Sequence, residues 1–150
     1  MGRSARGGGL KRGMKFQTFI NRPEELRNEI KTLEAQLEVL EAGPTVSSAP
    51  LTGMPKAQGP LSRVEENVIL IDEKRRLIEK RIREEEEARA ELAYLFSQLQ
   101  DSRYIEVLHR RYLGNMSFSA IAHETHRSEQ HVYRLHKAGL EAAEKIYRKS

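Results

Sequence analysis

The stretch from Met116 to Leu140, MSFSAIAHETHRSEQHVYRLHKAGL, predicts two short helices joined by a tight turn. Ser117 stands at the N-cap of the first helix, where its hydroxyl can accept a backbone N–H of the first turn. His126 and Arg127 are expected to form the turn, and Ser128 is placed to cap the second helix. This order of elements is typical of a helix-turn-helix.

The second helix has two faces of different character. Its apolar residues recur at spacings of three to four and predict a buried face of Val132, Leu135, Gly139 and Leu140. On the polar face, Gln130, His131 and Arg134 are candidates for base contacts, since Gln pairs with adenine and Arg with guanine in the major groove. With the phosphate candidates included, the candidate DNA-binding residues are Ser117, Arg127, Ser128, Gln130, His131, Tyr133, Arg134 and Lys137. The alternative is a small helical bundle whose polar face contacts only solvent.

Four short motifs lie in the last fifty residues: Val107-Leu108-x-x-Arg111-Tyr112, Met116-Ser117-Phe118, Ile121-Ala122 and Tyr133-Arg134-Leu135-His136. This region resembles region four of bacterial sigma factors and, more closely, the sigma-like phage regulators of the RinA and ArpU kind. The resemblance implies a phage-encoded regulator of transcription that binds double-stranded DNA in the cytoplasm of a bacterial host cell, with the host RNA polymerase as a further partner. The family usually has Leu-Gly at the interhelical turn, where this chain has Thr125-His126, and usually has acidic residues where Ser119 and Ala120 stand.

Composition limits the class of protein. Of the 150 residues, 32% are charged and 38% hydrophobic, which leaves little for a large globular core and favours an extended helical protein. The formal net charge is +4; residues 1 to 22 carry six Lys and Arg and no acid, and residues 101 to 150 carry nine bases against six acids. These basic ends favour an anionic partner. The chain has no cysteine, no apolar run of the roughly 20 residues that span a membrane and no signal-peptide core, so we expect a soluble, intracellular protein.

Residues 1 to 20 are expected to form a disordered basic arm, because few apolar groups offset the entropy of ordering them. Helical structure is expected to begin at Asn21 to Pro23, since Asn can cap a helix and Pro is tolerated in its first turn. A heptad repeat of Leu26, Ile30, Leu33, Leu37 and Leu40 follows. Gly43-Pro44 then ends the helix, and residues 43 to 60 are expected to form a linker.

A second, longer helix is expected from the capping box of Ser62 and Glu65 to about Leu99. Its four-three repeat consists of Val64, Val68, Ile71, Arg75, Ile78, Ile82, Glu85, Arg89, Leu92, Phe96 and Leu99. At 1.5 Å per residue this helix would be about 55 to 60 Å long, against about 30 Å for the first, so an intramolecular hairpin covers only half of its apolar stripe. We therefore expect self-association, most simply as a dimer.

Three further helices are expected at residues 102 to 113, 117 to 125 and 128 to about 147. Asp101 or Ser102 would cap the first of them, and Gly114-Asn115 would end it. Their core is expected to consist of Tyr104, Leu108, Tyr112, Phe118, Ile121, Val132, Leu135 and Leu140. Because this core is small for some fifty residues, we expect docking on the long helix or self-association to add stability.

Catalysis is not expected. His123-x-x-His126 beside Glu124 suggests a metal site, but the helix and the turn separate these side chains, and no cysteine or acidic triad completes a ligand set. The glycines at positions 7 to 9 lack the strand and helix of a phosphate-binding loop. We therefore expect no enzymatic activity, no metal and no cofactor.

The sequence thus predicts an all-α protein. A coiled-coil helical hairpin would occupy residues 21 to 100, and a three-helix helix-turn-helix domain residues 101 to 150. The expected function is that of a sequence-specific DNA-binding transcriptional regulator. Two alternatives remain open: a small terminase-like subunit for DNA packaging or assembly, which also joins a helix-turn-helix to helical oligomerisation elements, and a helical scaffold whose helix-turn-helix packs against protein.

Overall fold

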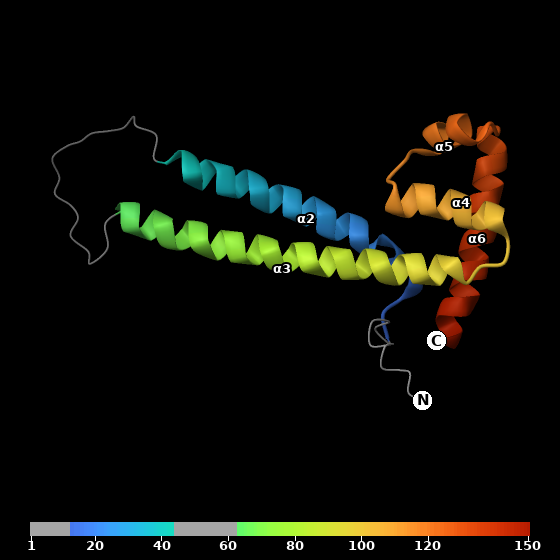
Figure 1. Cartoon of the computed structure of the whole chain (residues 1–150), viewed down its shortest axis with the longest axis horizontal. Coiled ribbons are helices and arrows are strands. Elements are labelled where there is room, and N and C mark those ends of the chain that lie inside the picture. Colours follow the sequence, from blue (N-terminus) through green and yellow to red (C-terminus); the bar gives the residue numbers. More distant parts are fainter. Residues whose placement is uncertain (1–12, 44–62) are drawn as a thin grey trace. The chain divides into compact units, whose positions relative to one another are not determined.

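The computed structural model describes residues 13–43 and 63–150, and all regular secondary structure in these ranges is helical. In chain order the elements are α2 (Phe16–Ala42), α3 (Arg63–Ser97), α4 (Ser102–Leu108), the π-helix η1 (His109–Leu113), α5 (Phe118–Thr125) and α6 (Glu129–Lys149) (Figure 1). The all-α fold class is therefore confirmed. The linker after Gly43, Ser62 of the capping box and residues 1–12 of the basic arm lie outside the described residues.

The described chain forms two compact units. One consists of the residues up to Leu26 together with Glu84–Ser150, and the other of Arg27–Arg83. The sequence placed a boundary near residue 100, whereas the unit that contains α4, α5 and α6 also takes in the last turns of α3. The reason is apolar packing, because Leu92 and Phe96 of α3 are fully buried in the same core as Leu108 of α4.

The start of α2 differs from the prediction. The helix begins at Phe16, so the expected start at Asn21–Pro23 and the expected disorder as far as residue 20 are wrong. Pro23 lies inside the helix, where the loss of its N–H costs roughly 3 kcal/mol. Phe19 and Ile20 are only 4% and 1% exposed, and burial of such side chains stabilises by about 1.5 to 3 kcal/mol each, which offsets that cost.

Within the unit Arg27–Arg83, α2 and α3 run antiparallel. The side-chain contacts that join them include Lys74 to Gln36 at 3.0 Å, Arg75 to Glu41 at 2.5 Å and Arg81 to Glu29 at 2.6 Å. Residues later in α3 thus meet residues earlier in α2, as in a helical hairpin. Exposed pairs of this kind contribute at most about 1 kcal/mol each, so burial of Leu33 and Ile78 is the larger stabilising term here.

The buried stripe of α3 departs from the predicted repeat at Val64, Val68, Arg75 and Ile82, which are exposed, and matches it at Ile78, Leu92, Phe96 and Leu99, which are buried. Ile78 is 7% exposed, as the repeat requires, but Ile82 is 37% exposed and the Arg75 side chain 58%. Ala88 and Leu95, which the predicted repeat leaves out, are buried at 7% and 2%. Two four-three registers are possible along α3, and they share half of their positions. The helix adopts the register that leaves Arg75 exposed to solvent and buries Ala88 and Leu95.

Helix α4 begins after Asp101, one of the two caps that the sequence offered, and continues into a π-helical turn. The Asp101 carboxylate accepts hydrogen bonds from the side chain and the backbone N–H of Arg103, which lower the pKa of Asp101 to about 2. After Leu108 the bonding changes to i→i+5, with the Gly114 N–H donating to the His109 carbonyl at 2.9 Å. A π turn brings residues five apart to the same face, so Leu108 and Leu113 are both buried.

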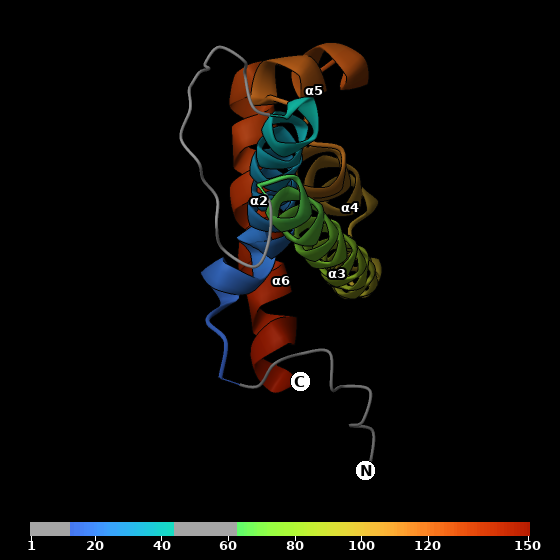
Figure 2. The same cartoon turned by 90° about the vertical axis from the view of Figure 1, so that its left-hand side faces the viewer.

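Helices α5 and α6 carry the caps that the sequence predicted. Ser117 Oγ accepts the Ala120 N–H at 3.0 Å, and Ser128 Oγ accepts the His131 N–H at 3.1 Å. Between the helices, His126 adopts the left-handed conformation with φ 58° and ψ 43°, which ends α5 and turns the chain into α6. Figures 1 and 2 show α5 lying against the first part of α6.

The core of the unit that contains α4 to α6 has two clusters. The larger consists of Phe19, Ile20, Leu92, Leu95, Phe96, Leu99, Leu108, Leu113 and Ala143, and the smaller of Val107, Ile121, Ala122, Val132 and Leu135. Of the predicted core, Leu108, Ile121, Val132 and Leu135 are buried, while Tyr104, Tyr112, Phe118 and Leu140 are half-buried. The small C-terminal core therefore docks on the long helix, one of the two supports that its size led us to expect.

Candidate nucleic-acid interface

The exposed face of α6 presents three of the predicted contact residues on its first turns. Gln130, Arg134 and Lys137 are all exposed and recur at spacings of four and three, which places them on one side of the helix. In the part of the chain that the structure describes, none of the three side chains has a hydrogen-bond or ion-pair partner. This face is therefore open to an external partner.

The opposite face fixes α6 in place. Val132, Leu135 and Ala143 are 0%, 5% and 0% exposed, and Gly139 is buried as well. A Cβ atom at Gly139 would lie 3.2 Å from Tyr104 Cβ and 3.2 Å from Leu108 Cδ1, so the absence of a side chain lets α4 and α6 cross closely. The polar face is thus held on a packed support.

His131 and Tyr133 lie beside this face and differ in exposure. His131 is half-buried, and its backbone N–H is used by the Ser128 cap. Tyr133 is 50% exposed, and its ring centroid lies 4.6 Å from that of Phe118. Tyr133 therefore remains half exposed to solvent while its ring packs on Phe118 of α5.

Ser117 and Ser128 occupy the N-termini of α5 and α6, where both hydroxyl oxygens accept a backbone N–H. Each hydroxyl retains its own hydrogen, which can be donated to a phosphate oxygen. Both residues are exposed. Since helix N-termini also present free N–H groups and the positive end of the helix dipole, the two positions are suited to phosphate contacts.

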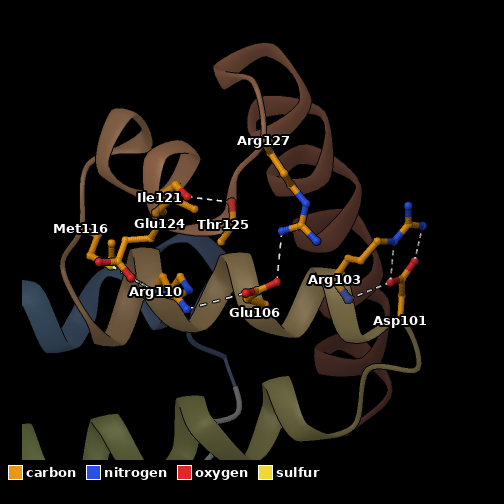
Figure 3. Close-up of polar contacts among 9 residues, drawn as sticks. All are labelled: Asp101, Arg103, Glu106, Arg110, Met116, Ile121, Glu124, Thr125 and Arg127. Carbon is orange, nitrogen blue, oxygen red and sulfur yellow. Dashed lines mark hydrogen bonds and ion pairs between the residues drawn. The ribbon is translucent and has the colours of Figure 1, made fainter.

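Arg127 is placed differently from the other candidates. Its side chain is only 20% exposed, and Nη1 donates to Glu106 Oε1 at 3.0 Å (Figure 3). The same carboxylate of Glu106 faces Arg110 at 3.7 Å, and Arg110 in turn donates to Glu124 at 3.0 Å. This set of four residues, which we call the turn network, joins α4, η1, α5 and the turn before α6.

A cluster of aromatic residues packs between η1, α5 and α6. The Tyr112 hydroxyl and His136 Nε2 are 2.8 Å apart, and the Arg111 guanidinium lies 4.8 Å from the centroid of the Phe118 ring. Burial lowers the pKa of His136 from its ordinary value of 6.5, and the charge of Arg111 lowers it further. Burial likewise raises the pKa of Tyr112. The cluster therefore favours a neutral His136, with its pair to Tyr112 intact.

Sequence reasoning missed the turn network. Glu106 and Arg110 are four residues apart on one helix, and this spacing is a visible signal for an ion pair. Their contacts with Arg127 and Glu124 depend on how the helices pack, and local sequence carries no signal for them.

Among residues 13–43 and 63–150 no group of three His, Asp or Glu side chains is arranged to hold a metal ion. No helix in the same ranges is both long and apolar enough to cross a membrane.

Comparison of the chain with known protein families, with curated proteins and with solved structures finds no match.

Proposed function

We propose that this chain is a sequence-specific DNA-binding regulator of transcription, in which the first turns of α6 enter the major groove. The observation that carries the proposal is the exposed face of Gln130, Arg134 and Lys137, which lies on a capped helix and has no partner among the described residues. Gln and Arg are the side chains that pair bidentately with adenine and guanine. The short left-handed turn at His126 and the resemblance to sigma region four support the same assignment.

The spacing on α6 fits the spacing of bases. Gln130 and Arg134 are four residues apart, which corresponds to a rise of about 6 Å along the helix. Base pairs are about 3.4 Å apart, so the two side chains can address neighbouring positions of one site. Lys137 follows one turn later, where an α-helix leaves the groove floor and a cation meets phosphate.

Binding titrations on a selected duplex and on random DNA test the proposal. Arg134→Ala should cost about 1 to 3 kcal/mol on the selected duplex and relax the preference at one base position, with a much smaller effect on random DNA. Lys137→Ala should weaken both duplexes alike and reduce the slope of log affinity against log salt by about 0.9. The matched control is Lys149→Ala, which removes one charge from an exposed residue about 18 Å beyond Lys137 on α6 and should leave the base preference unchanged.

Two results would contradict the major-groove assignment. One is a selection from random DNA that enriches no sequence. The other is an Arg134→Ala variant whose affinity and base preference both equal those of the unmodified protein. In either case the face of α6 would have to serve a protein partner instead.

A second copy of the chain is part of the proposal. Val64, Val68 and Ile82 are 66%, 59% and 37% exposed, and Val64 and Ile82 are separated by five full turns of α3, so they share one side of it. Burial of this apolar stripe against a second copy would remove it from water. Because a two-fold pair is the commonest closed arrangement, a dimer is the simplest outcome.

Sedimentation of the purified protein tests self-association. The double change Val68→Glu and Ile82→Glu should yield folded monomers, because both side chains are exposed within one chain. Ala35→Glu, at another exposed position, is the matched control and should leave the association unchanged. A monomeric unmodified protein at tens of micromolar would contradict a dimer, and a ring of many subunits would favour the packaging alternative over regulation.

A further inference from the structure

The guanidinium of Arg127 points into the molecule, although a basic residue at the N-terminus of a recognition helix would ordinarily be assigned to phosphate. Its side chain is 20% exposed, and its Nη1 lies 3.0 Å from Glu106 Oε1 on α4. Figure 3 shows the side chain reaching from the turn before α6 to the Glu106 carboxylate. This ion pair ties the turn that precedes α6 to α4.

Glu106 has a second basic neighbour. Its Oε2 lies 3.7 Å from Arg110 Nη2, and Arg110 Nη1 lies 3.0 Å from Glu124 Oε1 of α5. Charges alternate along the turn network, in the order Glu124, Arg110, Glu106, Arg127, so each guanidinium faces at least one carboxylate and the network as a whole is neutral. A neutral set of partly buried charges gains little from binding DNA phosphate, but it holds several elements in one geometry.

Apolar packing of Val132, Leu135 and Ala143 holds α6 on its support, and the turn before the helix adds one side-chain contact of its own. His126 adopts the left-handed conformation, and Ser128 is the N-cap, so Arg127 is the residue between them whose side chain contacts another helix. We propose that Arg127 is a positioning residue and that Glu106, its partner on α4, determines how well α6 discriminates between DNA sequences. This inference rests on the proposed function, and it adds a residue outside the helix-turn-helix to the set that governs specificity.

The positioning role and the phosphate role predict opposite results. If Arg127 binds phosphate, Arg127→Ala weakens all sequences alike and lowers the salt slope by about 0.9, and removal of the Glu106 charge strengthens binding. If Arg127 positions α6, Arg127→Ala and Glu106→Ala both lower the ratio of selected to random affinity, and the salt slope stays as in the unmodified protein. We expect a loss of discrimination of about three- to thirtyfold, within the range found for coupled neighbouring residues.

The experiment measures both affinities across a salt series for Arg127→Ala, Glu106→Ala and the double variant. Because the two residues act as one unit, the double variant should lose no more discrimination than either single variant. Glu141→Ala is the matched control, since it removes an exposed carboxylate from α6 itself and should raise both affinities equally. Circular dichroism verifies the fold of each protein. If Glu106→Ala does not fold, Glu106→Gln takes its place, because glutamine removes the charge and keeps an oxygen acceptor.

The outcomes separate this inference from the proposed function. If the unmodified protein enriches a sequence and Arg134→Ala relaxes it, while Glu106→Ala leaves the discrimination unchanged, only the positioning role of Glu106 is overturned. A salt slope lowered by about 0.9 in Arg127→Ala overturns it as well, in favour of a phosphate contact. If the unmodified protein enriches no sequence, the proposed function fails and this inference fails with it.

Discussion

The left-handed conformation of His126 at the turn before α6 should cost stability, and a substitution can measure that cost. His126 has φ 58° and ψ 43°, a conformation in which the Cβ atom of an L-residue lies too close to the backbone. The side chain is exposed, and its imidazole makes no hydrogen bond, ion pair or ring contact among the described residues. Replacement by glycine removes the strained Cβ and keeps the backbone N–H that donates to the His123 carbonyl at 3.3 Å.

The expected gain in stability is a difference between two terms. The left-handed conformation costs a non-glycine residue roughly 1 to 2 kcal/mol. Glycine in turn loses more conformational freedom on folding, which costs about 0.4 to 1 kcal/mol. His126→Gly should therefore raise the free energy of unfolding by about 0.5 to 1 kcal/mol, which corresponds to a melting temperature higher by about 1 to 4 °C for a chain of this size.

Urea unfolding followed by circular dichroism measures the effect. The matched control is His123→Gly, which makes the same change three residues earlier at an exposed position inside α5. There the glycine only lowers helix propensity, so the free energy of unfolding should fall by about 0.3 to 0.5 kcal/mol. If both variants lower the unfolding midpoint to the same extent, the left-handed conformation of His126 is not a source of strain and the reasoning is refuted.

Three further changes test other contacts. Gly114→Ala should lower the free energy of unfolding by about 1 to 3 kcal/mol, because a Cβ there would lie 2.9 Å from the Arg110 carbonyl oxygen. A urea titration measures this change, and an unchanged unfolding midpoint would show that η1 relaxes freely. Ser128→Ala should cost about 1 kcal/mol in the same assay through the lost N-cap, and no cost would mean that water replaces it. Since burial depresses the pKa of His136 in the folded state, the unfolded state binds a proton first, and stability should decline as pH falls below about 6.5. His136→Gln should flatten that part of the pH profile of the melting temperature, and a profile that the change leaves as it was would contradict this assignment.

The sequence predicted best what is decided locally. The sequence predicts the caps at Ser117 and Ser128 and offers Asp101 as one of two caps for α4, because a capping hydroxyl or carboxylate acts on an N–H two or three residues away. The turn at His126 followed from the same local logic. These features place the candidate recognition helix and its polar face correctly in the chain.

Features that depend on tertiary packing were predicted poorly. Pro23 was read as a helix start, but burial of the apolar residues before it extends the helix to Phe16. The α3 repeat is predicted wrongly at Val64, Val68, Arg75 and Ile82 but correctly at Ile78, Leu92, Phe96 and Leu99, because two registers share strong apolar residues and the partner helix selects between them. The contact of Arg127 with Glu106 joins residues that are 21 positions apart in the sequence, and no local pattern predicts it.

The core of the unit that carries α6 is built from segments far apart in the chain, and this has a consequence for how the protein folds during synthesis. The Tyr147 hydroxyl donates to the Met14 carbonyl across 133 positions, and the Tyr147 ring lies 4.8 Å from that of Phe19. At 5 to 20 residues per second, a ribosome needs roughly 7 to 27 s to make the intervening chain. During that time Phe19 and Ile20 have no α6 to pack against. Closure of this long loop, rather than formation of the individual helices, should therefore set the pace at which the unit that contains α6 is completed.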